Sequence, residues 1–193
     1  MVERKLTWIL LGAAIAMASL TAQSPGPARA QEKPAEESAA AQRERARIDA
    51  ASSLSLEEAR VIIEAAVARV RADKAHAAIA VVDDNGNLVS MDRIDGTSSF
   101  FQRFAVGKAV GAVALQQTTA ESAEQYKVNP QRFLSALSML QGEILLIRGG
   151  YPLIVDGRIV GGVGSAGHRG DGDVEAVKAG IAAWERYRET RSR

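Results

Sequence analysis

Cysteine is absent from all 193 residues of the chain, and aromatic residues make up only 5% of it. The absence of cysteine excludes a disulfide framework, thiolate zinc sites, a cysteine nucleophile and the covalent attachment of c-type haem. A metal ion held by this chain would therefore need nitrogen or oxygen ligands, or methionine. Histidine is also scarce, with only two residues in the whole sequence.

An excess of charge of either sign is also lacking. The 24 Lys and Arg residues nearly balance the 23 Asp and Glu residues, so the formal net charge is +1. Because no basic stripe appears, nucleic acid is not expected as a partner. A hydrophobic content of 47% and a charged content of 24% are typical of one globular domain with additional segments.

Long hydrophobic runs are missing, except near the N-terminus. Arg4 and Lys5 precede the apolar run Leu6–Leu20, and Ala28-Arg29-Ala30 has the small-x-small pattern of a signal-peptidase site. The run is shorter than the ~20 residues of a comfortable membrane span. We therefore expect residues 1–30 to be a signal peptide and the protein to be periplasmic or secreted, with no stable membrane span after cleavage. An uncleaved anchor is the alternative.

Two further regions follow the expected signal peptide. Residues 31–53 are rich in Ala, Glu, Gln and Arg and contain almost no large apolar residue, which predicts a polar, disordered linker. Residues 54–190 contain the periodic apolar patterns and are expected to form the folded domain.

Helices are predicted from their start signals and apolar periodicity. Ser55 and Glu58 are spaced as a capping box, in which each side chain satisfies a backbone amide of the other residue. Ala59, Ile63 and Val67 then give the following helix one apolar face. Further helices are predicted over residues 100–117 and 174–188, with shorter ones after the capping signals at Thr118 and Asn129-Pro130.

Strands are predicted where short apolar runs are bounded by turn residues. Residues 77–82 and 88–94 flank the turn Asp84–Asn87 and predict a hairpin. Ile144–Gly167 contains three apolar runs separated by Gly149-Gly150 and by Asp156-Gly157, and predicts three more strands. The sequence therefore predicts an α+β fold with about five strands in a mainly antiparallel sheet flanked by helices.

Glycine is unusually frequent in the last predicted strand and in the helix over residues 100–117. It weakens either element unless close packing or a ligand needs the space. We therefore expect a hollow between the two elements, with Lys108 and His168 at its mouth. The alternative is tight packing of the strand against a helix or a second subunit. The glycines concerned are Gly107, Gly111, Gly161, Gly162, Gly164 and Gly167.

A few charged side chains near this region could act chemically. A neutral imidazole at His168 could bind a metal or transfer a proton, or it could be an exposed loop residue. Lys108 could neutralise a carboxylate or phosphate, or its stem could pack while its ammonium stays in water. Arg103 could serve similarly, and Asp171 and Asp173 are interpreted as helix caps.

Four features then occur in order along the chain, and together they resemble the GlcG/HbpS-like haem-binding family. They are VVDDNGNLV followed by MDRIDG (Val81–Gly96), the pair Lys108-Ala109, the turn GGYPL (Gly149–Leu153), and DGRIVGGVGSAG (Asp156–Gly167) with Asp173 and Ala179-Gly180 beyond it.

The resemblance covers Leu54–Tyr187 and implies a profilin-like fold, frequent homo-oligomers and, in some members, binding of haem or a corrinoid. Some members are exported and linked to haem capture or haem-dependent redox sensing. The family commonly has a hydroxyl residue shortly after the Lys-Ala pair, where a haem-contacting threonine can lie. Val110 and Gly111 stand there in this chain, so that ligand is not carried over.

The leading hypothesis is an exported, homo-oligomeric binding protein for haem or a related tetrapyrrole. One alternative is an enzyme acting on a small organic acid or aldehyde, with His168 as acid or base and Lys108 holding the carboxylate. Another is an accessory interaction module of an exported redox system. The candidate cofactor-binding residues are Lys108, Phe104, Arg103, Gly164, Ser165, Gly167 and His168, and His168 is also the candidate metal ligand.

Overall fold

The computed structural model describes residues 38, 39, 41–43 and 54–191. The expected signal peptide and most of the expected linker lie outside the described residues. Among the described helices, none is both long enough and apolar enough to span a bilayer.

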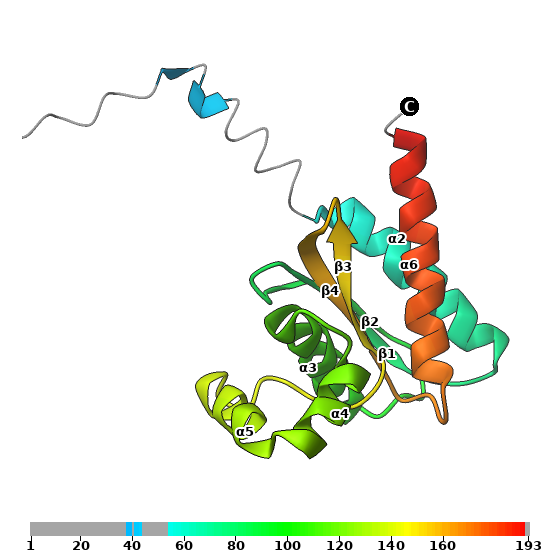
Figure 1. Ribbon diagram of the computed structural model, residues 1–193. Helices are drawn as coiled ribbons and strands as arrows, with labels where there is room; N and C mark the ends of the chain where they lie inside the picture. The colour runs from blue at the N-terminus through cyan, green and yellow to red at the C-terminus, as the bar shows by residue number, and fades with distance from the viewer. Residues whose placement is uncertain (1–37, 40, 44–53, 192–193) are drawn as a thin grey trace, which may run out of the picture. The chain divides into compact units, whose positions relative to one another are not determined.

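The elements follow one another as helix, hairpin, three helices, hairpin and helix (Figure 1). They are α2 (Leu56–Ala72), β1 (Ala78–Asp83), β2 (Leu88–Arg93), α3 (Phe100–Leu115), α4 (Thr119–Val128), α5 (Pro130–Met139), β3 (Gly150–Val155), β4 (Arg158–Ala166) and α6 (Gly172–Arg191).

The helix starts agree with the capping signals. At α2, Glu58 N–H donates to the Ser55 hydroxyl at 3.2 Å and Ser55 N–H donates to the Glu58 carboxylate at 2.9 Å, which confirms the capping box. Thr118 forms a second capping box with Glu121, and Asn129 caps α5 ahead of Pro130. These signals are short-range, so the sequence alone specifies them.

The described strands form one antiparallel sheet in the order β2-β1-β4-β3. The α+β class and the antiparallel pairing are confirmed, but the prediction of about five strands is wrong because this sheet has four. The predicted strand at Ile144 is not one: Leu145 N–H donates to the Gly107 carbonyl of α3 at 2.9 Å, and Ile144 is buried. An apolar run covered by a helix looks the same in sequence as one buried in a sheet.

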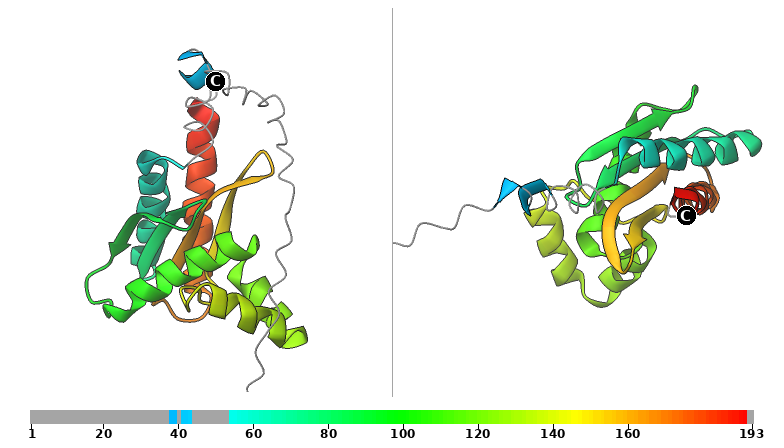
Figure 2. Two further views of the ribbon diagram at one scale, coloured as in Figure 1. Left: turned by 90° about the vertical axis from the view of Figure 1, so that its left-hand side faces the viewer. Right: turned by 90° about the horizontal axis from the view of Figure 1, so that it is seen from above.

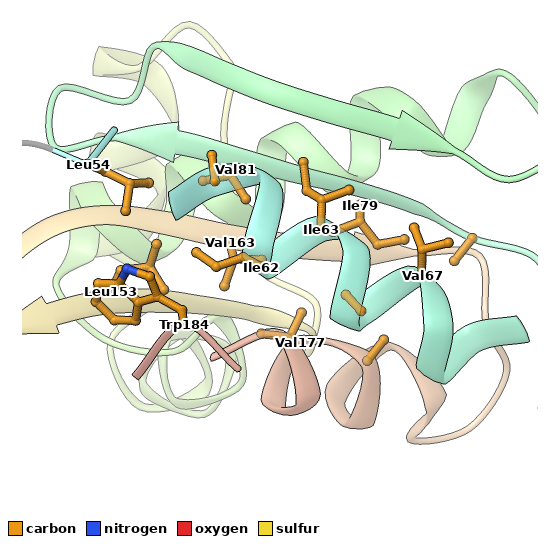
Figure 3. Packing of buried hydrophobic residues seen from close by; sticks show 14 of the residues in the cluster. Leu54, Ile62, Ile63, Val67, Ile79, Val81, Leu153, Val163, Val177 and Trp184 are labelled. Atoms are coloured by element: carbon orange, nitrogen blue, oxygen red, sulfur yellow. The ribbon is translucent and has the colours of Figure 1, made fainter. Parts of the chain in front are cut away.

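Helices cover both faces of the sheet (Figures 1 and 2). α2 and α6 pack side by side on one face, while α3 packs on the other face with α4 next to it. The main core lies between the α2–α6 layer and the sheet. Figure 3 shows Ile62 and Ile63 of α2 in this core with Ile79, Val81 and Val163 of the strands, and Trp184 of α6 near Leu153.

A buried carboxylate joins the two helices of that layer. Trp184 Nε1 donates to Glu58 at 3.1 Å, and Arg188 also donates to it. Burial by itself would raise the pKa of Glu58, but the hydrogen bonds from Ser55, Trp184 and Arg188 together lower it below its ordinary value. Glu58 therefore fixes the start of α2 against the end of α6.

Candidate functional site

The inner face of α3 consists of small residues and lies directly against β4. Ala105, Ala109 and Ala112 are fully buried. A Cβ added to Gly164 would lie 2.1 Å from the Ala105 carbonyl oxygen, and one on Gly162 would lie 2.6 Å from that of Ala109. The predicted hollow between β4 and this helix is therefore wrong. The glycines allow the strand and helix backbones to touch, as the alternative of tight packing predicted.

Lys108 spans this contact and is held by internal acceptors. Its Nζ donates to the Ser165 carbonyl at 2.6 Å and to the Asp173 carboxylate at 3.0 Å. Burial lowers the pKa of Lys108, the Asp173 carboxylate counteracts that effect, and the nearby Arg148 adds to it. Because the ammonium is buried and bonded inside the protein, it links α3 to β4 and α6.

Asp173 completes this cluster from the first turn of α6. Its second carboxylate oxygen accepts hydrogen bonds from the Ser165 hydroxyl at 3.0 Å and from the His168 backbone amide at 3.1 Å. The interpretation of Asp173 as a simple helix cap is incomplete, because its carboxylate also pairs with Lys108, 65 residues earlier in the chain.

The ring of His168 is directed elsewhere. Its Nε2 lies 3.2 Å from the Asp73 carboxylate just beyond the end of α2, and its Nδ1 lies 2.9 Å from the Arg169 carbonyl. Lys108 and His168 thus share Asp173 as a partner, but Lys108 contacts it with its ammonium and His168 only with its backbone amide. Nothing in this arrangement favours the enzyme hypothesis, which needs both side chains at one opening. Within the described residues, no group of three or more His, Asp or Glu side chains could hold a metal ion.

The outer face of α3 forms the floor of an open groove with a volume of about 890 Å³. The floor residues recur every three or four positions, the spacing of one helical face, and are Phe100, Arg103, Phe104, Gly107 and Val110. Gly86, Asn87 and Met91 of the β1–β2 hairpin form one wall. Residues 142–145 form the other wall, held to α3 by the Leu145–Gly107 hydrogen bond.

The groove is apolar with a cationic rim. The Phe100 and Phe104 rings meet edge to face with centroids 5.0 Å apart, although Phe100 is 58% exposed. Arg103 is exposed and has no hydrogen-bond or ion-pair partner among the described residues. A partly exposed aromatic pair beside an unpaired guanidinium suits a flat apolar ligand that carries an anionic group.

Of the predicted cofactor-binding residues, this groove contains Phe104 and Arg103. The others, Lys108, Gly164, Ser165, Gly167 and His168, are not part of its lining. Met91, Val110 and residues 142–145 also line the groove but were not predicted to do so from the sequence. The spacing of Phe100, Phe104 and Val110 along one helical face could have predicted the floor of the groove. The contact of residues 142–145 with α3 could not be predicted in this way, because only the tertiary fold brings them together.

Fold and groove together define a small α+β domain with an open groove along α3. The family model described as "Haem degrading protein HbpS-like" matches residues 54–182. The chain therefore belongs to the HbpS-like family.

Individual relatives agree with this assignment. The corrinoid adenosyltransferase PduO of Citrobacter freundii is 33% identical over 153 residues, which are 79% of this chain but only 45% of that protein. The crystal structure of HbpS is 33% identical with a TM-score of 0.61, covering 67% of this chain and 89% of that one. The crystal structure of a PduOC:haem complex is 28% identical with the same TM-score, 0.61, covering 68% and 94%.

Proposed function

We propose that this protein binds haem, or a related tetrapyrrole, in the groove on the outer face of α3. The observation that carries the proposal is the row of Phe100, Phe104 and Val110 along an open apolar groove with Arg103 at its rim. The volume of about 890 Å³ lies in the range of small-molecule sites. The related PduOC structure, solved as a haem complex, supports the choice of ligand.

The residues of the groove fit the chemistry of haem. Phe100 and Phe104 offer aromatic surface to a flat macrocycle, and Val110 offers an apolar floor. The Arg103 guanidinium can pair with a propionate, for which its planar fork of donors is well suited. When bound, haem supplies an iron centre for electron transfer or oxygen chemistry. The residues of this chain hold it and limit the access of water to it.

Replacing Val110 with arginine is expected to block the groove. A long charged side chain on its floor takes up volume and places a charge against apolar surface. We expect haem affinity to fall at least about tenfold, equivalent to 1.4 kcal/mol. Haem titration followed by absorbance in the Soret region measures this change. The matched control is Val128→Arg, because Val128 is 87% exposed at the end of α4 and lies outside the groove.

Two outcomes would contradict haem binding in this groove. If the wild-type protein gives no spectral change with micromolar haem, it is not a haem protein. A parallel titration with a corrinoid then separates the related tetrapyrrole from an accessory module that binds neither. If Val110→Arg and Val128→Arg bind haem equally well with unchanged melting temperatures, the ligand does not occupy this groove.

We further propose that the protein is exported and acts as a homo-oligomer in haem capture or redox sensing. The charged and apolar segments at the N-terminus support export. Leu134 and Met139 of α5 are 51% and 82% exposed, which supports assembly through an apolar surface. The intact mass of the protein purified from its host is expected to correspond to a chain starting at Gln31, and to a multiple of it under native conditions. A cytoplasmic full-length chain would contradict export.

A further inference from the structure

Few residues that line the groove on α3 are of a type that binds haem iron in proteins. Such iron is held by histidine, cysteine, methionine or tyrosine. Cysteine is absent from the chain, and no histidine or tyrosine lines the groove. The His168 ring contacts Asp73 and Arg169, and the His76 ring lies beside Gly96. Met91 is therefore the one residue of these four types in the lining.

The position of Met91 in the sheet directs it toward α3. Side chains alternate between the two faces along a strand. Its neighbour Asp92 pairs with Arg60 of α2 on the opposite face, at 3.0 Å. Met91 is paired with Ala80 in the β1–β2 register and packs in the cluster formed by Ala78, Ala80, Ala105 and Ala166 with Phe101, Phe104 and Val106. Its side chain thus stands at the wall of the groove, beside the aromatic rings.

We propose that the thioether sulfur of Met91 is the protein ligand to the haem iron, an inference that rests on the haem-binding function proposed above. A thioether is neutral and needs no deprotonation, so it is compatible with the apolar surroundings of Phe101 and Phe104. Met91 thereby tunes the iron toward a higher reduction potential than an oxygen ligand would.

The competing donor in the groove is the carboxylate of Glu143. Glu143 lies on the opposite wall, within residues 142–145, and its side chain is exposed to solvent. A carboxylate is a hard ligand, whereas the thioether is soft. The two assignments therefore predict different spectra and different reduction potentials.

The test compares the haem complexes of the full-length wild type and of Met91→Leu. Leucine keeps the apolar volume of methionine and removes only the sulfur. Haem affinity is expected to fall, and in the haem that the remaining groove residues still hold, the ferric and ferrous absorption bands shift and the reduction potential falls. Met139→Leu is the matched control, because Met139 is 82% exposed on α5 and outside the groove. Met91→His, which keeps an iron ligand of another type, is expected to give a third spectrum and covers the case in which leucine impairs folding.

The results separate this inference from the underlying function. Identical spectra and potentials for wild type, Met91→Leu and Met91→His, with haem bound in each, would overturn the role of Met91 and leave haem binding intact. A change in Glu143→Gln without one in Met91→Leu would assign the iron to the carboxylate. Absence of haem binding in the wild type would instead reject the proposed function, and the Met91 inference with it.

Discussion

Replacing Gly164 with alanine is expected to destabilise the domain by about 3 kcal/mol or more, at the upper end of overpacking substitutions. The added Cβ would lie 2.1 Å from the Ala105 carbonyl oxygen and 2.8 Å from the Ala109 nitrogen. Both contacts are with helix backbone, which no side-chain rotation can relieve. The sheet and α3 would have to separate along their whole contact. Urea unfolding followed by circular dichroism measures the loss.

Gly157→Asn is the matched control for this substitution. Gly157 stands in the β3–β4 turn with a φ of +76°, and no atom lies within 4 Å of the added Cβ. Asparagine tolerates this backbone conformation better than most residues, so little stability should be lost. Equal stability of the Gly164→Ala and Gly157→Asn variants would show that α3 does not lie against β4 as described.

Replacing Asp173 with alanine is expected to cost about 3–5 kcal/mol, the range for breaking a buried ion pair. The change leaves the Lys108 ammonium buried without a counter-charge, and deprives the Ser165 hydroxyl and the His168 amide of their acceptor. Asp171→Ala is the matched control, because the exposed ion pair of Asp171 with Arg148 should contribute no more than about 1 kcal/mol. Chemical denaturation of both variants at neutral pH measures the difference.

The pH dependence of the Asp173→Ala variant provides a second test. Burial lowers the pKa of Lys108 in the folded protein, and removing the carboxylate that counteracts this effect lowers it further. Between the folded and unfolded pKa values, the unfolded chain binds more protons, so stability rises with pH. The deficit relative to the wild type is therefore expected to shrink as pH rises from neutral toward the ordinary pKa of lysine. A deficit that does not change with pH would mean that the lysine charge is not its cause.

Replacing both members of the Lys108–Asp173 ion pair with apolar residues should recover part of the stability lost in Asp173→Ala. In Lys108→Met with Asp173→Leu, neither buried charge remains, and replacing a buried pair with hydrophobic residues is often neutral or stabilising. If the double variant is no more stable than Asp173→Ala alone, the loss of stability comes from the hydrogen bonds of Asp173 with Ser165 and His168 and not from the unpaired charge.

The parts of the fold that depend on residues close together in the sequence could be predicted from it. The capping boxes at Ser55 and Thr118 and the Asp156-Gly157 turn act within a few residues, and all appear where expected. The apolar run at Ile144 could not be assigned in this way. Its burial depends on Gly107 and Gly111 of α3, which are far away in the chain.

The candidate site was predicted only in part for the same reason. The small residues of α3 and β4 correctly indicated an unusual contact, but they do not reveal whether a ligand or another backbone fills the space. Lys108 was predicted to bind a ligand, but its ammonium is bonded inside the protein to Ser165 and Asp173. The sequence does not place the helix of Asp173 beside Lys108. Phe104 and Arg103, which were also predicted to bind a cofactor, belong to the helical face that lines the groove.

The close contact between α3 and β4 also determines which parts of the groove can adjust to a ligand. Because small residues bring the backbones of the helix and the strand close together, the floor of the groove cannot move toward the sheet when a larger molecule enters. The turn at Gly86 and the one at Gly142 end on the two walls, and both glycines adopt positive φ, of +84° and +78°. For the proposed tetrapyrrole ligands, discrimination by size is therefore expected to depend on the two walls. Exchanging those two turns between relatives should alter it.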